Sequence, residues 1–337
     1  MFIQSAALDF SKAFDRLQPA VLNEKMLVYG FNDNVISLVM NFLHNRHQCV
    51  SYQGAKSKYL SSTVGASQGT KLGPILWLIY CNDLTVEGFQ HIKYADDTTF
   101  YKAANNISET ALIAPAITAT QAWSDSNSML LNAEKTVVMN TSLSNRHSID
   151  QPLDINQSTI QPSPSTVFLG VKIDSKLTFN DHINSVTAKC NSRIFLMRKL
   201  KVAGLDSQGL KLFYLTNIRS IVCYASPAWV TILSKKNKDK LEGIQRTCTK
   251  VIYPDHSYEK RLELLLLPTL SDYMLHLALS HFKKIVANPL HPLHSRIHIN
   301  RHRRSARLNN EYNPAKARTT KRANSFFNFC MNFFNRP

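Results

Sequence analysis

The sequence predicts an α+β fold, and three observations support this prediction. Up to about residue 175, apolar or alternating runs suited to strands are interspersed with segments at helical spacing. After Thr178 the spacing of apolar residues becomes helical and stays so for about a hundred residues. From Asn288 the chain is rich in His, Arg and Asn. Three parts are therefore expected: a mixed part (residues 1–175), a helical part (residues 176–287) and a basic, flexible tail (residues 288–337).

The elements of the first half follow from apolar runs, Pro and Gly positions, and cap residues. In chain order they are a buried strand (Ile3–Phe10), a helix from Pro19 to Gly30, a helix over about residues 34–44, two strands around Gly54 (residues 48–53 and 58–65) and an apolar helix opened by Gly73-Pro74. Next come two short strands around Ala95-Asp96-Asp97 and a helix from Ser108, a possible cap, to Asn127.

The second half begins with a strand and then becomes helical. The expected elements are a strand (residues 136–140), a loop or short hairpin (residues 144–165), a strand (Val167–Ile173) and helices over about residues 181–200, 207–224, 238–252, 258–266 and 272–286. The first of these helices carries an apolar stripe that indicates a packed face, made of Ile183, Val186, Cys190, Ile194 and Met197.

Composition and charge narrow the class of protein. The 337 residues are 44% hydrophobic, which is enough for a core and argues against global disorder. The 40 Lys and Arg residues exceed the 23 Asp and Glu residues, and 12 of the basic residues lie from Lys283 onward with a single acid. A solvated basic face is the alternative interpretation, but an excess of this size favours a polyanionic partner such as nucleic acid.

Membrane and disulfide signals are absent from the sequence pattern. The longest apolar run, Ile75–Tyr80, is far shorter than the roughly 20 residues of a membrane span, so no membrane partner is expected. No secretory signal pattern is visible. The six cysteines are widely spaced, so we expect free thiols in an intracellular protein, in the nucleus, the cytoplasm or both.

Two acidic segments carry the chemistry. One contains Asp9 and Asp15, and the other contains the neighbours Asp96 and Asp97 between two apolar strands. Asp-Asp pairs also occur by chance in surface turns, but like charges on a half-buried sheet favour a bound cation. Two-metal phosphoryl transfer uses carboxylates from separate strands that converge on two Mg²⁺ ions about 4 Å apart. Asp9 and Asp96 would supply that arrangement.

Five segments together resemble a known family. LDFSKAFDRL, ASQGTKLGPILWLIYCNDL, KYADDTTFY, LNAEKT and FLGVKIDSKLTF occur in this order. They resemble motifs A to E of the reverse transcriptases of non-LTR retrotransposons of the jockey-like type. The resemblance implies a right-hand polymerase palm, an antiparallel sheet with helices, followed by an α-helical thumb-like region. It also implies RNA-directed DNA polymerase activity on an RNA template and a DNA primer, with deoxynucleoside triphosphates as substrates.

The resemblance assigns catalytic roles to four residues. Asp9, Asp96 and Asp97 would be the metal ligands for two Mg²⁺ ions, with Mn²⁺ as a substitute. Lys135 would be the general acid that protonates the pyrophosphate leaving group. A solvated lysine is an equally weighted interpretation of Lys135.

Nucleotide contacts are implied for Phe10, Phe14, Gln68 and Gly69. The Phe10 carbonyl would bind a metal ion, and the Phe14 ring would exclude a 2′-hydroxyl, although a core position is the common fate of a phenylalanine. Gln68 and Gly69 would lie against the nascent base pair. The alternative interpretation of Gly69 is an ordinary turn glycine. Two further expectations concern their surroundings: Asp15 forms a local hydrogen bond, and Ser67, where the family commonly has proline, loosens the loop.

Primer and template contacts are implied further along the chain. Phe168, Leu169 and Gly170 would form the primer grip on a strand, and they would position the primer 3′ end. The following helix carries four basic residues that would contact the nucleic-acid backbone: Lys189, Arg193, Arg198 and Lys199.

Motif A lies close to residue 1, whereas in the family the fingers and an endonuclease region precede it. The fingers are therefore expected to be missing, and the chain is expected to be the palm and thumb of a longer protein. This expectation leaves a second hypothesis open, a catalytically inert nucleic-acid-binding remnant. In the tail, His291, His294, His298 and His302 lie near Arg301, Arg303 and Arg304. No cysteine lies between Cys248 and Cys330, so a loose RNA-binding tail is favoured over a zinc knuckle.

Overall fold

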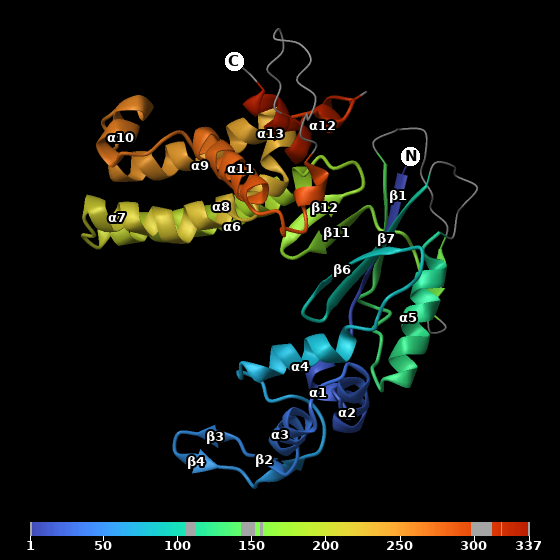
Figure 1. Cartoon of the computed structure of the whole chain (residues 1–337). Helices are drawn as coiled ribbons and strands as arrows, with labels where there is room; N and C mark the ends of the chain where they lie inside the picture. The colour runs from blue at the N-terminus through green and yellow to red at the C-terminus, as the bar shows by residue number, and fades with distance from the viewer. Residues whose placement is uncertain are drawn as a thin grey trace. The chain divides into compact units, whose positions relative to one another are not determined.

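The computed structural model describes residues 2–104, 112–142, 152–155, 158–297, 312–317 and 319–335. The chain divides into two compact units (Figure 1). Unit one comprises Met1–Phe168 and Asp174–Leu177, and unit two comprises Leu169–Ile173 and Thr178–Pro337.

A four-stranded antiparallel sheet forms the centre of unit one. Its strands lie in the order β6 (Gln90–Tyr94), β7 (Asp97–Ala104), β1 (Phe2–Leu8) and β8 (Val137–Thr141). In β1 every second side chain is buried, as expected for a strand with one face on the core. The predicted strand pair around Ala95-Asp96-Asp97 is confirmed by β6 and β7.

In the described part of unit one, five helices accompany this sheet. They are α1 (Ala13–Arg16), α2 (Pro19–Val28), α3 (Asp33–Leu43), α4 (Leu72–Cys81) and α5 (Ala114–Ser126). Pro19 is at the start of α2 as predicted, and Gly30 follows the helix with a φ of 75°. The helix α4 begins two residues before Pro74, because a proline is tolerated in a first turn whose N–H groups have no helical acceptor. The predicted cap Ser108 lies outside the described residues.

Short two-stranded pairs complete unit one. They are β2 (Arg46–Gln48) with β5 (Leu60–Ser62), β3 (Ser51–Tyr52) with β4 (Ala55–Lys56), and β9 (Leu153–Ile155) with β10 (Ser158–Ile160). The strands around Gly54 are therefore shorter than predicted. The pair β9–β10 confirms the short hairpin among the two options for this serine- and proline-rich segment.

The prediction of one strand over Val167–Ile173 is wrong. Instead β11 (Ser165–Phe168) ends before a turn, and β12 (Val171–Asp174) begins after it. Leu169 and Gly170 have φ values of 46° and 80°, a backbone conformation that a strand does not allow. The predicted primer grip therefore lies at a turn.

Unit two is helical. Its elements are α6 (Asn180–Val202), α7 (Ser207–Phe213), the π-helix η1 (Tyr214–Arg219), α8 (Ser220–Cys223), the short η2 (Ser226–Ala228) and η3 (Val230–Ile232), α9 (Lys235–Ile252), α10 (Tyr258–Leu265), α11 (Leu270–Ala287), η4 (His294–Arg296), α12 (Thr320–Ala323) and α13 (Phe326–Phe334). The predicted apolar stripe of α6 is confirmed, because all five of its residues are buried. Figure 1 shows α6, α9 and α11 side by side, and α9 packs against both of the others.

The last described residues include a helix that the expected loose tail did not contain. Cys330 and Met331 of α13 are buried, and they belong to a cluster with Phe282 of α11 and with Tyr312. Three ring contacts link Phe282 to α13 and a fourth links it to Tyr312, and together they fix α13 on α11. His298, Arg301, His302, Arg303 and Arg304 lie outside the described residues.

Two general features concern helices and cysteines. Among the described residues no single helix combines the length and apolar character of a membrane span. The pair α10 and α11 reaches that composition only jointly, across a bend of 50°. All six cysteines are free thiols, as predicted.

Candidate active site

Three carboxylates meet at one end of the sheet of unit one. The pairing of β1 with β7 ends with Leu8 opposite Thr98, so the next positions along this register are Asp9 and Asp97. Asp96 lies in the turn between β6 and β7, because Tyr94 pairs with Asp97. The structure thus brings Asp9, Asp96 and Asp97 together although 87 positions separate Asp9 from Asp96.

These carboxylates repel one another. Partial burial raises the pKa of Asp97 above its ordinary value, and the negative charges of Asp96 and Asp9 raise it further. Like charges at this spacing destabilise the ionised sheet end unless a cation lies among them.

One oxygen of Asp9 lacks a hydrogen-bond donor. Asp9 Oδ2 is buried without a hydrogen-bond partner among the described residues. The Nζ atom of Lys135 lies 3.5 Å from it, and the Lys135 side chain is 68% exposed. The segment before Lys135 is tied to Asp9, because the Asn132 N–H donates to the Asp9 carbonyl at 2.8 Å. The predicted general acid is therefore beside the predicted metal ligand, with its ammonium group in the position of a cation.

The donor set fits Mg²⁺, which prefers hard carboxylate oxygens. The buried, unsatisfied oxygen of Asp9 is the observation that supports this fit. In the part of the chain that the structure describes, no three His, Cys, Asp or Glu side chains are already gathered in a metal-holding arrangement. The carboxylates thus suit Mg²⁺ by their oxygen donors and by their nearness to one another. In this structure Lys135 supplies the positive charge beside Asp9.

The turn that carries Asp96 is held by Trp77, a residue that no sequence motif singled out. Ala95 has a φ of 52°, which non-glycine residues rarely adopt. The buried Trp77 of α4 donates its Nε1–H to the Ala95 carbonyl at 2.6 Å. A tryptophan inside an apolar helix needs a partner for its N–H, and this was the only available signal in the sequence.

Both motif A phenylalanines contact the same tryptophan. Phe10 is buried, with ring centroids 6.3 Å from Trp77 and 5.8 Å from Trp123. Phe14 is partly buried, and its ring centroid lies 5.5 Å from that of Trp77. Trp77 therefore connects the segment that carries Asp9 with the turn that carries Asp96.

The predicted nucleotide contacts Gln68 and Gly69 are exposed. Asp15 forms the expected local hydrogen bond through its N–H, which donates to the Lys12 carbonyl at 3.0 Å, and its Oδ1 also accepts from Gln68 Nε2 at 3.0 Å, 53 positions away. Gly69 has a φ of 78°, and a Cβ added at this position would meet no atom within 4 Å. That side of the loop therefore has room for a close approach.

Ser67, which is expected to loosen the loop, accepts a hydrogen bond from a distant arginine, and that expectation stays a prediction. Arg46 donates to Ser67 Oγ at 2.9 Å and to the carbonyls of Val64 and Gly65. Gly65 is needed here, since a Cβ would lie 2.8 Å from the Asp15 carbonyl oxygen. Arg46 thus holds the loop although it lies 21 positions before Ser67 in the sequence, a contact that sequence patterns do not reveal.

The predicted primer-grip residues lie around the turn between β11 and β12. In unit two the Tyr224 hydroxyl donates to the Leu169 carbonyl at 2.8 Å. A Cβ on Gly170, whose φ is 80°, would lie 3.4 Å from the Tyr224 ring. Tyr224 is therefore a positioning residue for this turn, and no sequence pattern pointed to it.

The four predicted backbone-binding residues of α6 are exposed but do not share one face. Lys189 and Arg193 are one helical turn apart and lie on the same side. Arg198 is close enough to Cys248 to oppose the burial that raises the pKa of that thiol to about 12. Lys199 lies over the Phe195 ring at 5.5 Å.

Comparison with known families identifies the class of this fold and site. Residues 5–173, half of the chain, match the family "Reverse transcriptase (RNA-dependent DNA polymerase)". The chain belongs to this family, which confirms the family assignment made from its motifs.

The relatives are retrotransposon proteins. The chain is 25% identical over 300 residues to the RNA-directed DNA polymerase from mobile element jockey of Drosophila melanogaster, covering 84% of this chain and 32% of that protein. It is 22% identical over 263 residues to the probable RNA-directed DNA polymerase from transposon BS of the same species, covering 74% and 29%. Among solved structures, apo telomerase from Candida tropicalis is 14% identical with a TM-score of 0.40, covering 85% of this chain and 51% of that chain. The chain spans about a third of the length of the curated relatives it matches.

Proposed function

We propose that this chain is the palm and thumb part of an RNA-directed DNA polymerase of a jockey-like retrotransposon. The reaction would join a deoxynucleotide to a primer 3′-hydroxyl on an RNA template. The observation that carries this proposal is the meeting of Asp9, Asp96 and Asp97 at one sheet end, with an unsatisfied buried oxygen on Asp9.

In this proposal Asp9, Asp96 and Asp97 hold two Mg²⁺ ions, or Mn²⁺ in their place. Bound metal supplies Lewis-acid activation of the primer hydroxyl and neutralises phosphate charge. Lys135 holds a proton on Nζ, 3.5 Å from Asp9, and delivers it to the pyrophosphate leaving group. Its exposure leaves the ammonium group free to swing from Asp9 to a phosphate oxygen.

Nucleotide selection rests on the loop and ring residues. The Phe14 ring is backed by Trp77, so it is held in place and excludes a 2′-hydroxyl sterically. The carbonyl of Phe10 would bind one of the metal ions. Gln68, oriented by Asp15, and Gly69, which has no side chain, lie against the new base pair.

Binding of the primer and template strands rests on unit two, which includes the turn at Leu169 and Gly170. Phe168, Leu169 and Gly170 hold the primer end, with the turn fixed by Tyr224. Lys189 and Arg193 contact backbone phosphates from one side of α6, while Arg198 and Lys199 do so from others, which makes binding sensitive to salt.

A second candidate function is a nucleic-acid-binding protein without catalysis. The Asp9–Lys135 ion pair favours it, because an internal cation already neutralises the carboxylate. This candidate predicts RNA binding that survives Asp96→Asn and an absence of polymerisation under every condition.

Primer extension on an RNA template in Mg²⁺ separates the two candidates. The chain is tested alone and joined to the region that precedes the matched part of the jockey polymerase. Extension by either form, lost in Asp96→Asn and kept in the surface control Asp33→Asn, is the expected result. If neither form extends a primer that an unrelated reverse transcriptase extends, the polymerase proposal is wrong.

A further inference from the structure

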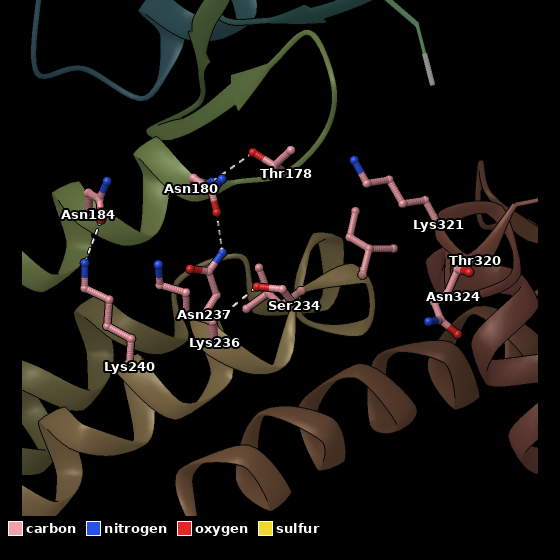
Figure 2. A pocket seen from close by; sticks show the side chains of 12 residues that line it. Thr178, Asn180, Asn184, Ser234, Lys236, Asn237, Lys240, Thr320, Lys321 and Asn324 are labelled. Carbon is pink, nitrogen blue, oxygen red and sulfur yellow. Dashed lines mark hydrogen bonds between the residues drawn. The ribbon is translucent and has the colours of Figure 1, made fainter. Parts of the chain in front are cut away.

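Unit two contains a cavity of about 740 Å³ that none of the roles above uses (Figure 2). Its walls come from three parts of the chain: the start of α6, the start of α9 with the segment before it, and α12. The volume falls within the range of roughly 300–1,000 Å³ that is typical of ligand sites.

The charges on its walls have one sign. Lys236, Lys240 and Lys321 line the cavity, and among the residues that the structure describes no Asp or Glu does. Neither Lys236 nor Lys240 forms an ion pair with a described residue. Figure 2 shows Lys321 extending from α12 on one side, with Lys236 and Lys240 of α9 on the other. Three ammonium groups around one cavity favour an anion inside it.

The placement of lysines in α9 breaks a local rule of helix stability. Lys235, Lys236, Lys238 and Lys240 are among its first six residues, and its first turn holds no acidic residue. The N-terminus of a helix carries partial positive charge, so basic residues there are unfavourable. Departures of this kind are expected at functional sites, where a bound ligand offsets the cost. An anion at this end of α9 would do so.

Hydrogen-bond donors of two helix starts lie at the same cavity. Asn237 Nδ2 donates to Asn180 Oδ1 at 2.8 Å, which joins the first turn of α9 to that of α6. Asn237 is buried, so this link is part of the packed unit. Lys240 Nζ donates to Asn184 Oδ1 at 2.6 Å, which orients one ammonium group. The N–H of Asn237 already donates to Ser234 Oγ at 3.3 Å, so the lysine ammonium groups are the donors that remain for an anion.

We propose that this cavity binds the phosphate groups of a single-stranded RNA segment. The cavity is larger than one phosphate needs, and the formal charge of +17 attracts extended polyanions more than small ones. The site extends the proposed function, since it adds an RNA contact in unit two that is separate from the carboxylates and from the four basic residues of α6. It does not depend on polymerisation.

Fluorescence anisotropy with a labelled, unstructured single-stranded RNA tests the proposal on the full chain. The double variant Lys236→Gln, Lys240→Gln removes two lining charges. The control Lys235→Gln, Lys250→Gln removes two exposed charges from the same helix that do not line the cavity. The lining variant should weaken binding about tenfold and lower the slope of log K against log salt by about 1.4, at about 0.7 per lysine. The control should shift binding by less than about threefold.

Three further measurements distinguish the possible causes of a change in RNA binding. Lys321→Gln, in a different element, should weaken binding in the same direction, which preserves the test if the double variant unfolds by circular dichroism. Asp96→Asn should leave RNA affinity unchanged, so a failure of polymerisation is not mistaken for a failure of this site. Equal losses in the lining and control variants would overturn the proposal. Displacement of RNA by equimolar tripolyphosphate or dATP would also overturn it, in favour of a site for free phosphates.

Discussion

Asp9 of unit one has a partly buried carboxylate and Glu242 of unit two has a buried one, but the two differ in their hydrogen-bond donors. Glu242 is 8% exposed, and it accepts the N–H groups of Leu270 and Ser271 and the Tyr258 hydroxyl. It therefore caps the start of α11. Asp9 Oδ2 has no hydrogen-bond donor among the described residues, and the charge of Asp9 raises the pKa of the neighbouring Asp97. A fully bonded carboxylate stabilises the fold, whereas an incompletely bonded one is available to a cation.

The lysine-lined cavity of unit two resembles the carboxylate site of unit one, with charges of the opposite sign. Its three lysines carry charges of one sign, as the three carboxylates of unit one do, and no described acidic residue lines the cavity. In both places the sequence departs from what stability alone favours.

The largest expected effect comes from breaking the bonded carboxylate. Glu242→Ala leaves two N–H groups and a hydroxyl without their acceptor, so the free energy of unfolding should fall by about 3 kcal/mol. Glu263→Ala, on the exposed side of α10, should change it by less than about 0.5 kcal/mol. Urea unfolding followed by circular dichroism measures both. Equal stability of the two variants would contradict the assigned role of Glu242.

Trp77→Phe should have the next largest effect. A single, smaller aromatic ring replaces the buried indole, and the Ala95 carbonyl loses its donor, which alone costs about 1–2 kcal/mol in unfolding free energy. Mn²⁺ affinity should fall as well, because the turn that carries Asp96 is no longer held. Trp123→Phe is the matched control, since it removes an indole bond to Asp83 and not one to this turn. Mn²⁺ affinity that fell equally in both variants would show that Trp77 acts only through general stability.

A smaller effect is expected from Asp97→Asn, on the pH dependence of the unfolding free energy. The folded-state pKa of Asp97 is raised, so its contribution to stability is fully present below the unfolded pKa and is lost as pH rises through the folded pKa. Asp97→Asn should therefore reduce the pH dependence of the unfolding free energy across this acidic range, and should not lower stability at neutral pH. Asp33→Asn serves as an exposed control. A loss of stability at neutral pH in Asp97→Asn alone would contradict the inferred repulsion among the three carboxylates.

The smallest effect on stability is expected from Lys135→Gln. The side chain is 68% exposed, so the unfolding free energy should change by less than about 0.5 kcal/mol. Mn²⁺ affinity should rise, because the competing ammonium group is gone from Asp9. Lys56→Gln, on the exposed strand β4, should leave this affinity unchanged. Calorimetric titration of both variants measures the difference, and weaker Mn²⁺ binding in Lys135→Gln would be evidence against the competition.

Features with a local period were predictable from the sequence. The alternation in β1, the Pro19 helix start and the α6 stripe follow from residue spacing within one element. The convergence of Asp9 and Asp96 was inferred from two acidic segments flanked by strands, and the family motifs added the roles of Asp97 and Lys135. The contacts of Trp77, Arg46 and Tyr224 were not predictable, because each joins elements that are distant in the sequence and leaves no periodic signal.

Two errors have physical causes. The turn at Leu169-Gly170 was missed because apolar residues continue through it, and a single glycine inside a strand pattern was the only sign of a break. The helix α13 was missed because the basic composition around it outweighed its own apolar run, FFNFCMNFF. Burial against Phe282, a long-range contact, decides its structure.

Binding of Mn²⁺ tests most directly whether Asp9, Asp96 and Asp97 form a cation site. Electron paramagnetic resonance of free Mn²⁺ would be followed as the full chain, Asp9→Asn, Asp96→Asn and the control Asp33→Asn are added. We expect that the unchanged chain and the control deplete free Mn²⁺ alike, and that both sheet-end variants weaken this binding at least about tenfold. Equal depletion by all four proteins would contradict a cation site at this sheet end.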